Sequence, residues 1–260
     1  MDKSHPPAGG WDLSFDILSP KVFKINMSGE SSRSNLSDRA ILRHMDEGNI
    51  FISPFNRQSL NTTSYDVKLG KWFWREQYPE SGGPHSRRVY NPWSKNDVQR
   101  IWGDNPYCAE LAGDWMRKYG FLENIYEDNQ LIWIEPGETI LCHTEEFIGG
   151  RGGIVTTMMK ARSGMGRSFI EVCKCAGWGD VGFTNRWTME VTNNSRYYSI
   201  PLVVGRRIAQ IVFFEVEPIL DSDYTETGKY QNSDDMEKVM KDWNPTNMLP
   251  KMYKDREARR

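Results

Sequence analysis

A short segment of the chain combines arginine, serine and glycine in a pattern that could bind an anion. Residues 162–167 read Arg-Ser-Gly-Met-Gly-Arg. Glycine lets a backbone approach a ligand closely, and arginine can hold phosphate oxygens with two parallel hydrogen bonds. Together with free backbone N–H groups and a hydroxyl, these residues would form a cradle for an anion. A solvated loop is the alternative, because short segments of this composition are common.

A glycine-rich corner follows at residues 176–183, which read Ala-Gly-Trp-Gly-Asp-Val-Gly-Phe. The pattern predicts a turn between two strands, with Asp180 at its tip. Such a corner could hold backbone amides and carbonyls against the edge of a flat ligand. A plain hairpin without a ligand explains the same residues equally well.

Glu190 lies in a segment, residues 187–193, that reads Trp-Thr-Met-Glu-Val-Thr-Asn and predicts a strand. Side chains alternate between the two faces of a strand, so Glu190 shares its face with Thr188 and Thr192. If this face meets solvent, Glu190 is an ordinary surface acid, which is the commoner case. If it lines a pocket, Glu190 has a perturbed pKa and is a candidate general base.

The cysteines and histidines do not form a convincing metal motif. His143-Thr144-Glu145 matches the first half of the H-x-E and P-C-x-x-C pattern of zinc deaminases. The second half is missing, because Cys173 and Cys175 are separated by one residue and no proline precedes them. In a strand these two thiols would point to the same face. We therefore expect no zinc, no disulfide framework and a reducing compartment.

The composition is typical of a globular protein with polar ends. The chain has 260 residues, a net charge of -2, 38% hydrophobic residues and ten tryptophans. No apolar run approaches the roughly 18–20 residues of a membrane span, and the N-terminus does not resemble a secretory signal. We therefore expect a cytoplasmic protein with no membrane or nucleic-acid partner. The tryptophans could stack on bases, but packing in cores and interfaces is their commoner use.

The elements that would position these residues are mostly short strands. Ser37 predicts the start of a helix that ends at Gly48, and residues 50–55 and 62–70 read as strands. From residue 130 onward, short strands alternate with turn signals, which favours an antiparallel sandwich or barrel.

The domain organisation follows from where composition changes. Residues 1–34 are rich in Ser, Gly and Pro and predict a flexible tail. Residues 35–235 form the β domain, with an aromatic insertion at 71–128 that holds one helix within 105–121. Residues 236–260 read as a C-terminal tail that is amphipathic at 236–243 and ends in a basic, solvated stretch at 251–260.

Taken together, the motifs resemble the dCTP deaminase branch of the dUTPase superfamily. The family pattern is R-S-S-x-x-R, then A-G-x-x-D-x-G-F, then T-x-E. The internal spacings match without a gap, and at these positions the chain supplies Arg162, Ser163, Gly164, Arg167, Ala176, Gly177, Asp180, Gly182, Phe183, Thr188 and Glu190. Residues 36–70 and 131–231 also resemble the family, including its P-G-E segment and its K-Y-Q tail.

The resemblance implies a fold and an assembly. The fold would be mainly β, a dUTPase-like distorted antiparallel β-barrel or jelly roll with a few helices and a helical, aromatic insertion. Members similar to this chain are homotrimers with sites at subunit interfaces, so the cradle and the base of one site could come from different chains.

The resemblance also implies roles for individual residues. Glu190 would be the base that activates water for attack on cytosine C4, and Ser163 and Arg167 would orient the water and stabilise the developing charge. The implied nucleotide-binding residues are Arg162, Gly164, Cys175, Ala176, Asp180, Gln210, Tyr224, Lys229, Tyr230 and Gln231. No protein metal site is implied, and Mg²⁺ would bridge the triphosphate.

Several functions fit this resemblance. The first is a dCTP deaminase that releases dUTP and ammonia; the second is a bifunctional enzyme that continues to dUMP and pyrophosphate, with Asp180 as a possible hydrolytic base. A plain dUTPase and a nucleotide-binding regulator without turnover are further alternatives. The chain departs from the family pattern at Gly164, Gly179 and Ser233, which could shift preference toward a modified cytosine or dCMP.

Overall fold

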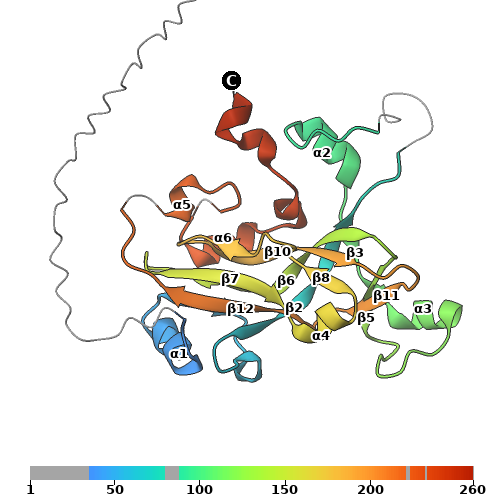
Figure 1. Ribbon diagram of the computed structural model, residues 1–260, viewed down its shortest axis with the longest axis horizontal. Coiled ribbons are helices and arrows are strands. Elements are labelled where there is room, and N and C mark those ends of the chain that lie inside the picture. Colours follow the sequence, from blue (N-terminus) through green and yellow to red (C-terminus); the bar gives the residue numbers. More distant parts are fainter. Residues whose placement is uncertain (1–34, 80–87, 221–222, 232, 260) are drawn as a thin grey trace, which may run out of the picture. The chain divides into compact units, whose positions relative to one another are not determined.

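A large antiparallel β-sheet carries most of the structure (Figure 1). The computed structural model describes residues 35–79, 88–220, 223–231 and 233–259. Within them, the nine-stranded sheet has the order β8-β10-β6-β2-β12-β7-β9, with β1 paired to β6 and β3 paired to β2. A three-stranded sheet has the order β11-β5-β4. All the strand pairs are antiparallel, so the expected mainly β fold is confirmed, whereas the homotrimer stays a prediction.

The elements have the following bounds. The strands are β1 (Ile50–Ser53), β2 (Tyr65–Arg75), β3 (Tyr107–Cys108), β4 (Glu110–Leu111), β5 (Gln130–Ile134), β6 (Thr139–Gly150), β7 (Val155–Ala161), β8 (Ile170–Val172), β9 (Trp178–Gly179), β10 (Thr184–Asn193), β11 (Ile200–Val203) and β12 (Arg207–Glu215). The α-helices are α1 (Asp38–Asp46), α2 (Lys95–Trp102), α3 (Ala112–Tyr119), α4 (Ser163–Arg167), α5 (Tyr224–Thr227) and α6 (Met236–Asp242). Short 3₁₀ helices are η1 (Arg57–Ser59), η3 (Pro245–Met248), η4 (Met252–Lys254) and η5 (Arg256–Arg259).

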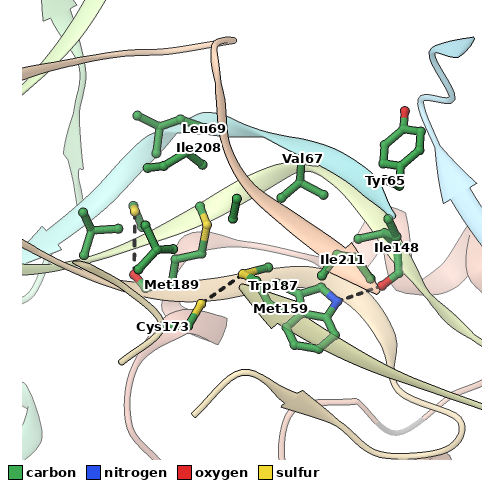
Figure 2. Close-up of a cluster of buried hydrophobic side chains, with 14 of the residues drawn as sticks. Tyr65, Val67, Leu69, Ile148, Met159, Cys173, Trp187, Met189, Ile208 and Ile211 are labelled. Atoms are coloured by element: carbon green, nitrogen blue, oxygen red, sulfur yellow. Dashed lines mark hydrogen bonds between the residues drawn. The ribbon is translucent and has the colours of Figure 1, made fainter. Parts of the chain in front are cut away.

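The hydrophobic core forms because alternate residues of neighbouring strands point to the same side (Figure 2). In β10, Trp187, Met189 and Val191 are buried, whereas Thr188 and Glu190 on the other face are half-buried. The indole nitrogen of Trp187 donates to the carbonyl of Ile148 in β6 at 2.9 Å, so this tryptophan enters the core with its polar atom paired. The alternation expected from the sequence is confirmed, and it turns Glu190 away from this core.

The helix expected after Ser37 is also confirmed. The Ser37 hydroxyl accepts from the backbone N–H of Ala40 at 3.4 Å, and α1 presents Ile41 to the core. Gly48 ends the turn with φ +78°, a conformation that glycine adopts without steric cost.

A close approach of two strands requires glycine at position 70. A Cβ atom built on Gly70 of β2 would lie 2.0 Å from Cε1 of His143 in β6. The ring of His143 is buried, with Nδ1 2.8 Å from the carbonyl of Thr144 and Nε2 3.3 Å from the backbone N–H of Trp72. The Thr144 carbonyl can only accept a hydrogen bond, so Nδ1 carries the proton; the Trp72 N–H can only donate, so Nε2 is unprotonated. Burial lowers the pKa of His143 to about 4, so the imidazole is neutral at pH 7.

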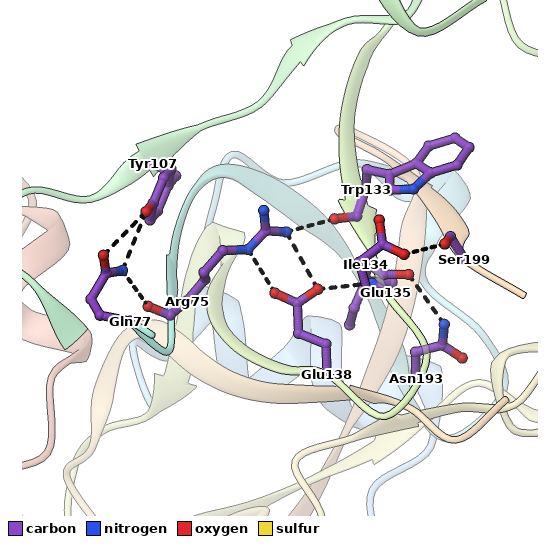
Figure 3. A network of polar contacts seen from close by, with 9 residues as sticks. All are labelled: Arg75, Gln77, Tyr107, Trp133, Ile134, Glu135, Glu138, Asn193 and Ser199. Atoms are coloured by element: carbon purple, nitrogen blue, oxygen red, sulfur yellow. Dashed lines mark hydrogen bonds and ion pairs between the residues drawn. The ribbon is translucent and has the colours of Figure 1, made fainter. Parts of the chain in front are cut away.

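The segment 71–128 is attached to the sheet more closely than an insertion on a surface would be. β2 continues to Arg75, β3 pairs with β2, and β4 pairs with β5. The expected helix is α3, whereas α2 was not expected, although Ser94 caps it. Figure 3 shows how the end of β2 is fixed: the Arg75 guanidinium donates to the Glu138 carboxylate at 2.6 Å and to the carbonyl of Trp133 at 2.7 Å.

Residues 243–249, within the expected C-terminal tail, pack on the sheet. Trp74 of β2 donates its indole N–H to the carbonyl of Pro245 at 2.8 Å, and Met248 packs on Trp74 and Leu141. Residues 236–243 have a helical spacing of apolar residues and contain α6, whereas the apolar side chains after them are separated by prolines and give no periodic signal of their burial. The expected tail at 1–34 lies outside the described residues.

None of the helices in the described ranges has the length and apolar character needed to cross a bilayer.

Candidate active site

A cavity of about 410 Å³ lies beside β10, on the face opposite the main core. Three groups of residues line it. β10 and its neighbour β6 provide Asn185, Arg186, Trp187, Thr188, Glu190 and Leu141; the corner provides Ala176, Trp178, Asp180 and Phe183; and the C-terminal part provides Tyr224, Tyr230, Trp243, Asn247, Met248, Pro250 and Met252. The volume is in the range of cavities that bind small molecules.

Glu190 is the carboxylate of this cavity with a perturbed pKa. Its side chain is half-buried, and burial raises its pKa, although the cation of Lys174 opposes the shift. The backbone of Glu190 is fixed by pairing with Leu141 of β6 and by accepting from the Cys173 N–H at 2.9 Å. A carboxylate with a raised pKa on a fixed strand can accept a proton from water and return it, which is the chemistry of a general base.

The corner at 176–183 is shaped by glycines that admit no larger residue. A Cβ on Gly177 would lie 2.3 Å from the carbonyl oxygen of Met159, and the Met159 N–H donates to the Gly177 carbonyl at 2.7 Å. Gly182 has φ +89°, and a Cβ there would lie 2.7 Å from the Asp223 carboxylate. In this corner, which pairs with β7 through β9, Asp180 is exposed and lines the cavity.

The two cysteines before the corner do not share a face, which corrects the expectation for a strand. β8 ends at Val172, and both Cys173 and Lys174 have positive φ, 63° and 41°. This turn buries Cys173 against the sulfur of Met159 at 2.9 Å and leaves Cys175 exposed. Cys175 does not line the cavity, whereas the next residue, Ala176, does. In the described part of the chain, no group of three or more His, Cys, Asp or Glu side chains could hold a metal ion.

Residues 162–167, which the sequence indicated as an anion-binding segment, contain a short helix, α4, rather than forming an open loop. Ser163, Gly164 and Arg167 are exposed on it. Arg162 precedes it and lies 3.5 Å from the buried carboxylate of Asp66, which also accepts from Arg207 at 3.0 Å. A second cavity of about 530 Å³ adjoins this helix and is lined by Asn56, Gln58, Ser59, Lys68, Arg162, Met165, Gly205, Arg206 and Arg207.

Within one chain, the cradle and the base are not brought together. The two cavities share no residue, and neither Ser163 nor Arg167 lines the one that contains Glu190. Figure 1 shows α4 on one side of the sheet and α6 on the other. Gln210 is half-buried in β12 and lines neither cavity.

The K-Y-Q segment is held against the chain by several contacts. Tyr224 and Tyr230 line the Glu190 cavity, and the Tyr230 hydroxyl accepts from the Lys251 N–H at 3.2 Å. The Lys229 ammonium is paired with Asp255. Gln231 is buried and its amide bonds only to backbone groups, so the structure places this residue beneath the corner and not on the cavity wall.

Arg186 is a cavity residue that the sequence did not single out. Its guanidinium lies over the rings of both Phe147 and Trp243, 4.8 and 4.6 Å from their centroids, and its Nε donates to the Glu145 carbonyl at 3.2 Å. Arg186 stands four residues before Glu190, and an even separation in a strand places two side chains on the same face. This was the signal that could have found it, although a register shift after Arg186 interrupts the regular alternation of faces in β10. The cavity therefore holds a cation as well as a carboxylate.

The sequence is similar to a known enzyme family over most of its length. The dCTP deaminase-like family model matches residues 35–216. A protein named "dCTP deaminase, dUMP-forming" from Methanococcus aeolicus is 28% identical over 185 residues, which are 68% of this chain and 82% of that protein. A protein of the same name from Sulfurihydrogenibium sp. is 30% identical over 201 residues, 75% of this chain and 91% of that protein.

Solved structures show a weaker likeness. The 2′-deoxycytidine 5′-triphosphate deaminase from Agrobacterium tumefaciens is similar over 72% of this chain and 50% of its own, with a TM-score of 0.47 and 17% identity. A dUTPase from equine infectious anaemia virus (EIAV) is similar over 35% of this chain and 73% of its own, with a TM-score of 0.30 and 20% identity.

Proposed function

This chain belongs to the dCTP deaminase-like family, and we propose that it deaminates dCTP in the Glu190 cavity and hydrolyses the product to dUMP and pyrophosphate. The observation that carries the proposal is the half-buried Glu190, which lines one cavity together with Ala176 and Asp180 of the family's corner motif. This second reaction was the alternative in the sequence analysis. The relatives' name, "dCTP deaminase, dUMP-forming", favours it over release of dUTP.

In the deamination, Glu190 would take one proton from a water molecule in the cavity. The resulting hydroxide attacks C4 of cytosine, and the ring nitrogen N3 receives the proton from Glu190. The tetrahedral intermediate then expels the amino group, which leaves as ammonia after Glu190 transfers the hydroxyl proton to it. The balance is dCTP plus water giving dUTP plus ammonia. A carboxylate with a raised pKa suits both halves of this cycle because it is neither too weak a base nor too weak an acid.

In the hydrolysis, a second water molecule would attack the α-phosphorus of dUTP. The bond to the bridging oxygen breaks, and the products are dUMP and pyrophosphate. Asp180 lies exposed at the same cavity and is the candidate base for this water. Mg²⁺ would arrive bound to the triphosphate and so belongs to the substrate, as expected from the charge of that group.

We further propose that each complete site uses two chains of a homotrimer. Ser163 and Arg167 would reach the Glu190 cavity from a neighbouring chain, because within their own chain they lie outside it. The second cavity carries the cationic side chains of Lys68, Arg162, Arg206 and Arg207, which suit the triphosphate of a nucleotide whose base lies in the neighbouring chain's cavity.

The test is a product assay with purified protein, Mg²⁺ and either dCTP or dUTP. Wild type should release ammonia, dUMP and pyrophosphate from dCTP. Glu190→Gln should abolish ammonia release, whereas Glu171→Gln, a half-buried glutamate of β8 outside the cavity, should not. Accumulation of dUTP would establish the monofunctional enzyme instead. An unchanged dCTP pool would refute the deaminase proposal, and nucleotide binding without turnover would identify a regulator.

A mixing experiment tests the two-chain site. Glu190→Gln and Arg167→Ala should each be inactive alone. When the two variants are expressed together, about a quarter of the sites would combine an intact glutamate and an intact arginine if chains assemble at random. Activity should therefore reappear at roughly that fraction of wild type. No recovery in a confirmed mixed oligomer would show that both residues act within one chain.

A further inference from the structure

The C-terminal part of the chain contributes a whole wall to the Glu190 cavity. Trp243, Asn247, Met248, Pro250 and Met252 line it, and we define residues 243–252 as the C-terminal wall. These residues lie beyond the range 35–216 that the family model matches. Four of the five lining side chains are apolar, so they face the uncharged part of a nucleotide better than its phosphates.

The C-terminal wall packs in a cluster with Leu141, the residue of β6 that pairs with Glu190. Met248 is 3% exposed and packs in a hydrophobic cluster with Trp74 and Leu141, separate from the main core. Leu141 is the direct partner of Glu190 in the β6–β10 ladder, and both line the cavity. Met248 therefore lines the same cavity as Glu190 and clusters with its strand neighbour, where it takes up space that water would otherwise fill.

The wall is fixed on both sides of Met248. Before it, the Pro245 carbonyl accepts from the indole N–H of Trp74, and Trp243 packs on the His143 ring with centroids 4.7 Å apart. After it, the Lys251 N–H donates to the Tyr230 hydroxyl at 3.2 Å. These contacts tie the wall to β2, to β6 and to the K-Y-Q segment, so it is a positioned part of the cavity.

We propose that the C-terminal wall is part of the catalytic site, where Met248 acts as a positioning residue that keeps water away from Glu190 and closes the cavity around the pyrimidine. The proposal rests on the deaminase function proposed above. Its physical basis is desolvation: apolar atoms next to a carboxylate disfavour its charged form.

The electrostatic environment agrees with this role. Burial is the main cause of the raised pKa of Glu190, and the only cation that opposes it among the described groups coupled to Glu190 is Lys174, on the turn after β8. The other described titratable groups coupled electrostatically to Glu190 are Cys142 and Cys173, which lie in the main core on the other face of β10, and Tyr230 of the tail; the pKa values of all three are raised, so they are uncharged at neutral pH. Asp180 and Arg186 line the same cavity and have to be kept unchanged in the test.

The experiment compares Met248→Ala with two controls in the full-length chain. Met248→Leu keeps the apolar volume, and Met236→Ala removes another buried methionine, in α6, that does not line the cavity. The first readout is the acid limb of the pH profile for ammonia release from dCTP. The second is a ¹³C NMR titration of the Glu190 carboxyl, assigned with Glu190→Gln, which needs no turnover.

Met248→Ala should move both the acid limb and the NMR titration of Glu190 to lower pH by about half a unit or more, because water reaches the carboxylate. Met248→Leu and Met236→Ala should leave both in place, even if Met236→Ala lowers the melting temperature. An equal loss of activity at every pH, with an unmoved titration, would overturn the proposal. If wild type releases no ammonia, the proposed function fails, but the NMR titration still decides the role of the wall.

A second variant covers the case in which Met248→Ala does not fold. Met252→Ala alters the second methionine of the wall, which is half-buried, lies in η4 and lines the cavity. It should shift the Glu190 titration in the same direction. No shift in this variant would also overturn the proposal.

Discussion

The side chain of Gln231 offers a direct test of how the tail is joined to the corner of the site. Its Oε1 accepts from the Thr184 N–H at 2.8 Å, and its Nε2 donates to the carbonyls of Gly182 at 3.3 Å and Ser233 at 3.0 Å. The residue is 5% exposed. Gln231→Leu keeps much of the volume but removes every one of these bonds.

The expected cost follows from the groups that are left behind. The Thr184 N–H is buried at the start of β10 and would lose its partner, which costs about 1–3 kcal/mol. Each of the two lost bonds to carbonyl oxygens contributes about 0.5–1.5 kcal/mol, and the added apolar contacts of leucine offset part of this. We expect Gln231→Leu to lower the free energy of unfolding by about 2–4 kcal/mol.

Urea denaturation at constant pH measures this difference. Gln210→Leu is the matched control, because Gln210 is half-buried and makes no side-chain hydrogen bond within the described ranges; its effect should stay within about 0.5 kcal/mol. Gln231→Glu can still accept from Thr184 but, when ionised, would point a buried charge at two carbonyls, so its stability should fall as pH rises. The reasoning is refuted if Gln231→Leu keeps wild-type stability, and a loss of nucleotide affinity alone would restore the role expected from the sequence.

Three further changes test other parts of the structure. Burial raises the pKa of Glu146 to about 7, so its ionisation costs stability as pH rises from 4.5 to 7; Glu146→Gln should raise the free energy of unfolding by about 3 kcal/mol at pH 8 and by almost nothing at pH 4, as urea titrations at both pH values would show. Gly177→Ala should cost about 1–3 kcal/mol and strongly reduce ammonia release, because its methyl group would meet the Met159 carbonyl; wild-type stability and activity would contradict this. Asp66→Asn should cost about 1–3 kcal/mol in the same assay, because it removes the charge that holds two arginines; a stabilised variant would argue against this.

Local chemistry in the sequence was sufficient to predict several elements. Ser37 and Gly48 marked the ends of α1 because capping depends on residues within one turn. The period-two pattern of β10 placed Trp187 in the core and Glu190 on the opposite face. The glycines of the corner indicated close backbone contact, which Gly177 makes with β7.

The remaining features depend on contacts between distant segments. Cys173 and Lys174 have left-handed backbone conformations that non-glycine residues rarely adopt, so the sequence favoured a strand there. The packing of Met248 on Leu141 joins residues that are far apart in the chain and carries no periodic signal. The separation of Arg167 from the Glu190 cavity within one chain does not follow from the order and spacing of the motifs, and it was anticipated only through the homotrimer that the family resemblance implies.

The approach of Gly70 to His143 also constrains how these strands can change during evolution. Any side chain at position 70 would overlap the imidazole ring, so a substitution there is tolerated only after position 143 has become smaller. The reverse order is open, because a smaller residue at 143 leaves Gly70 in place and costs a cavity and the partner of the Trp72 N–H. Mutational paths through this pair therefore run in one direction, and among homologues a side chain at position 70 should occur only with a small residue at position 143.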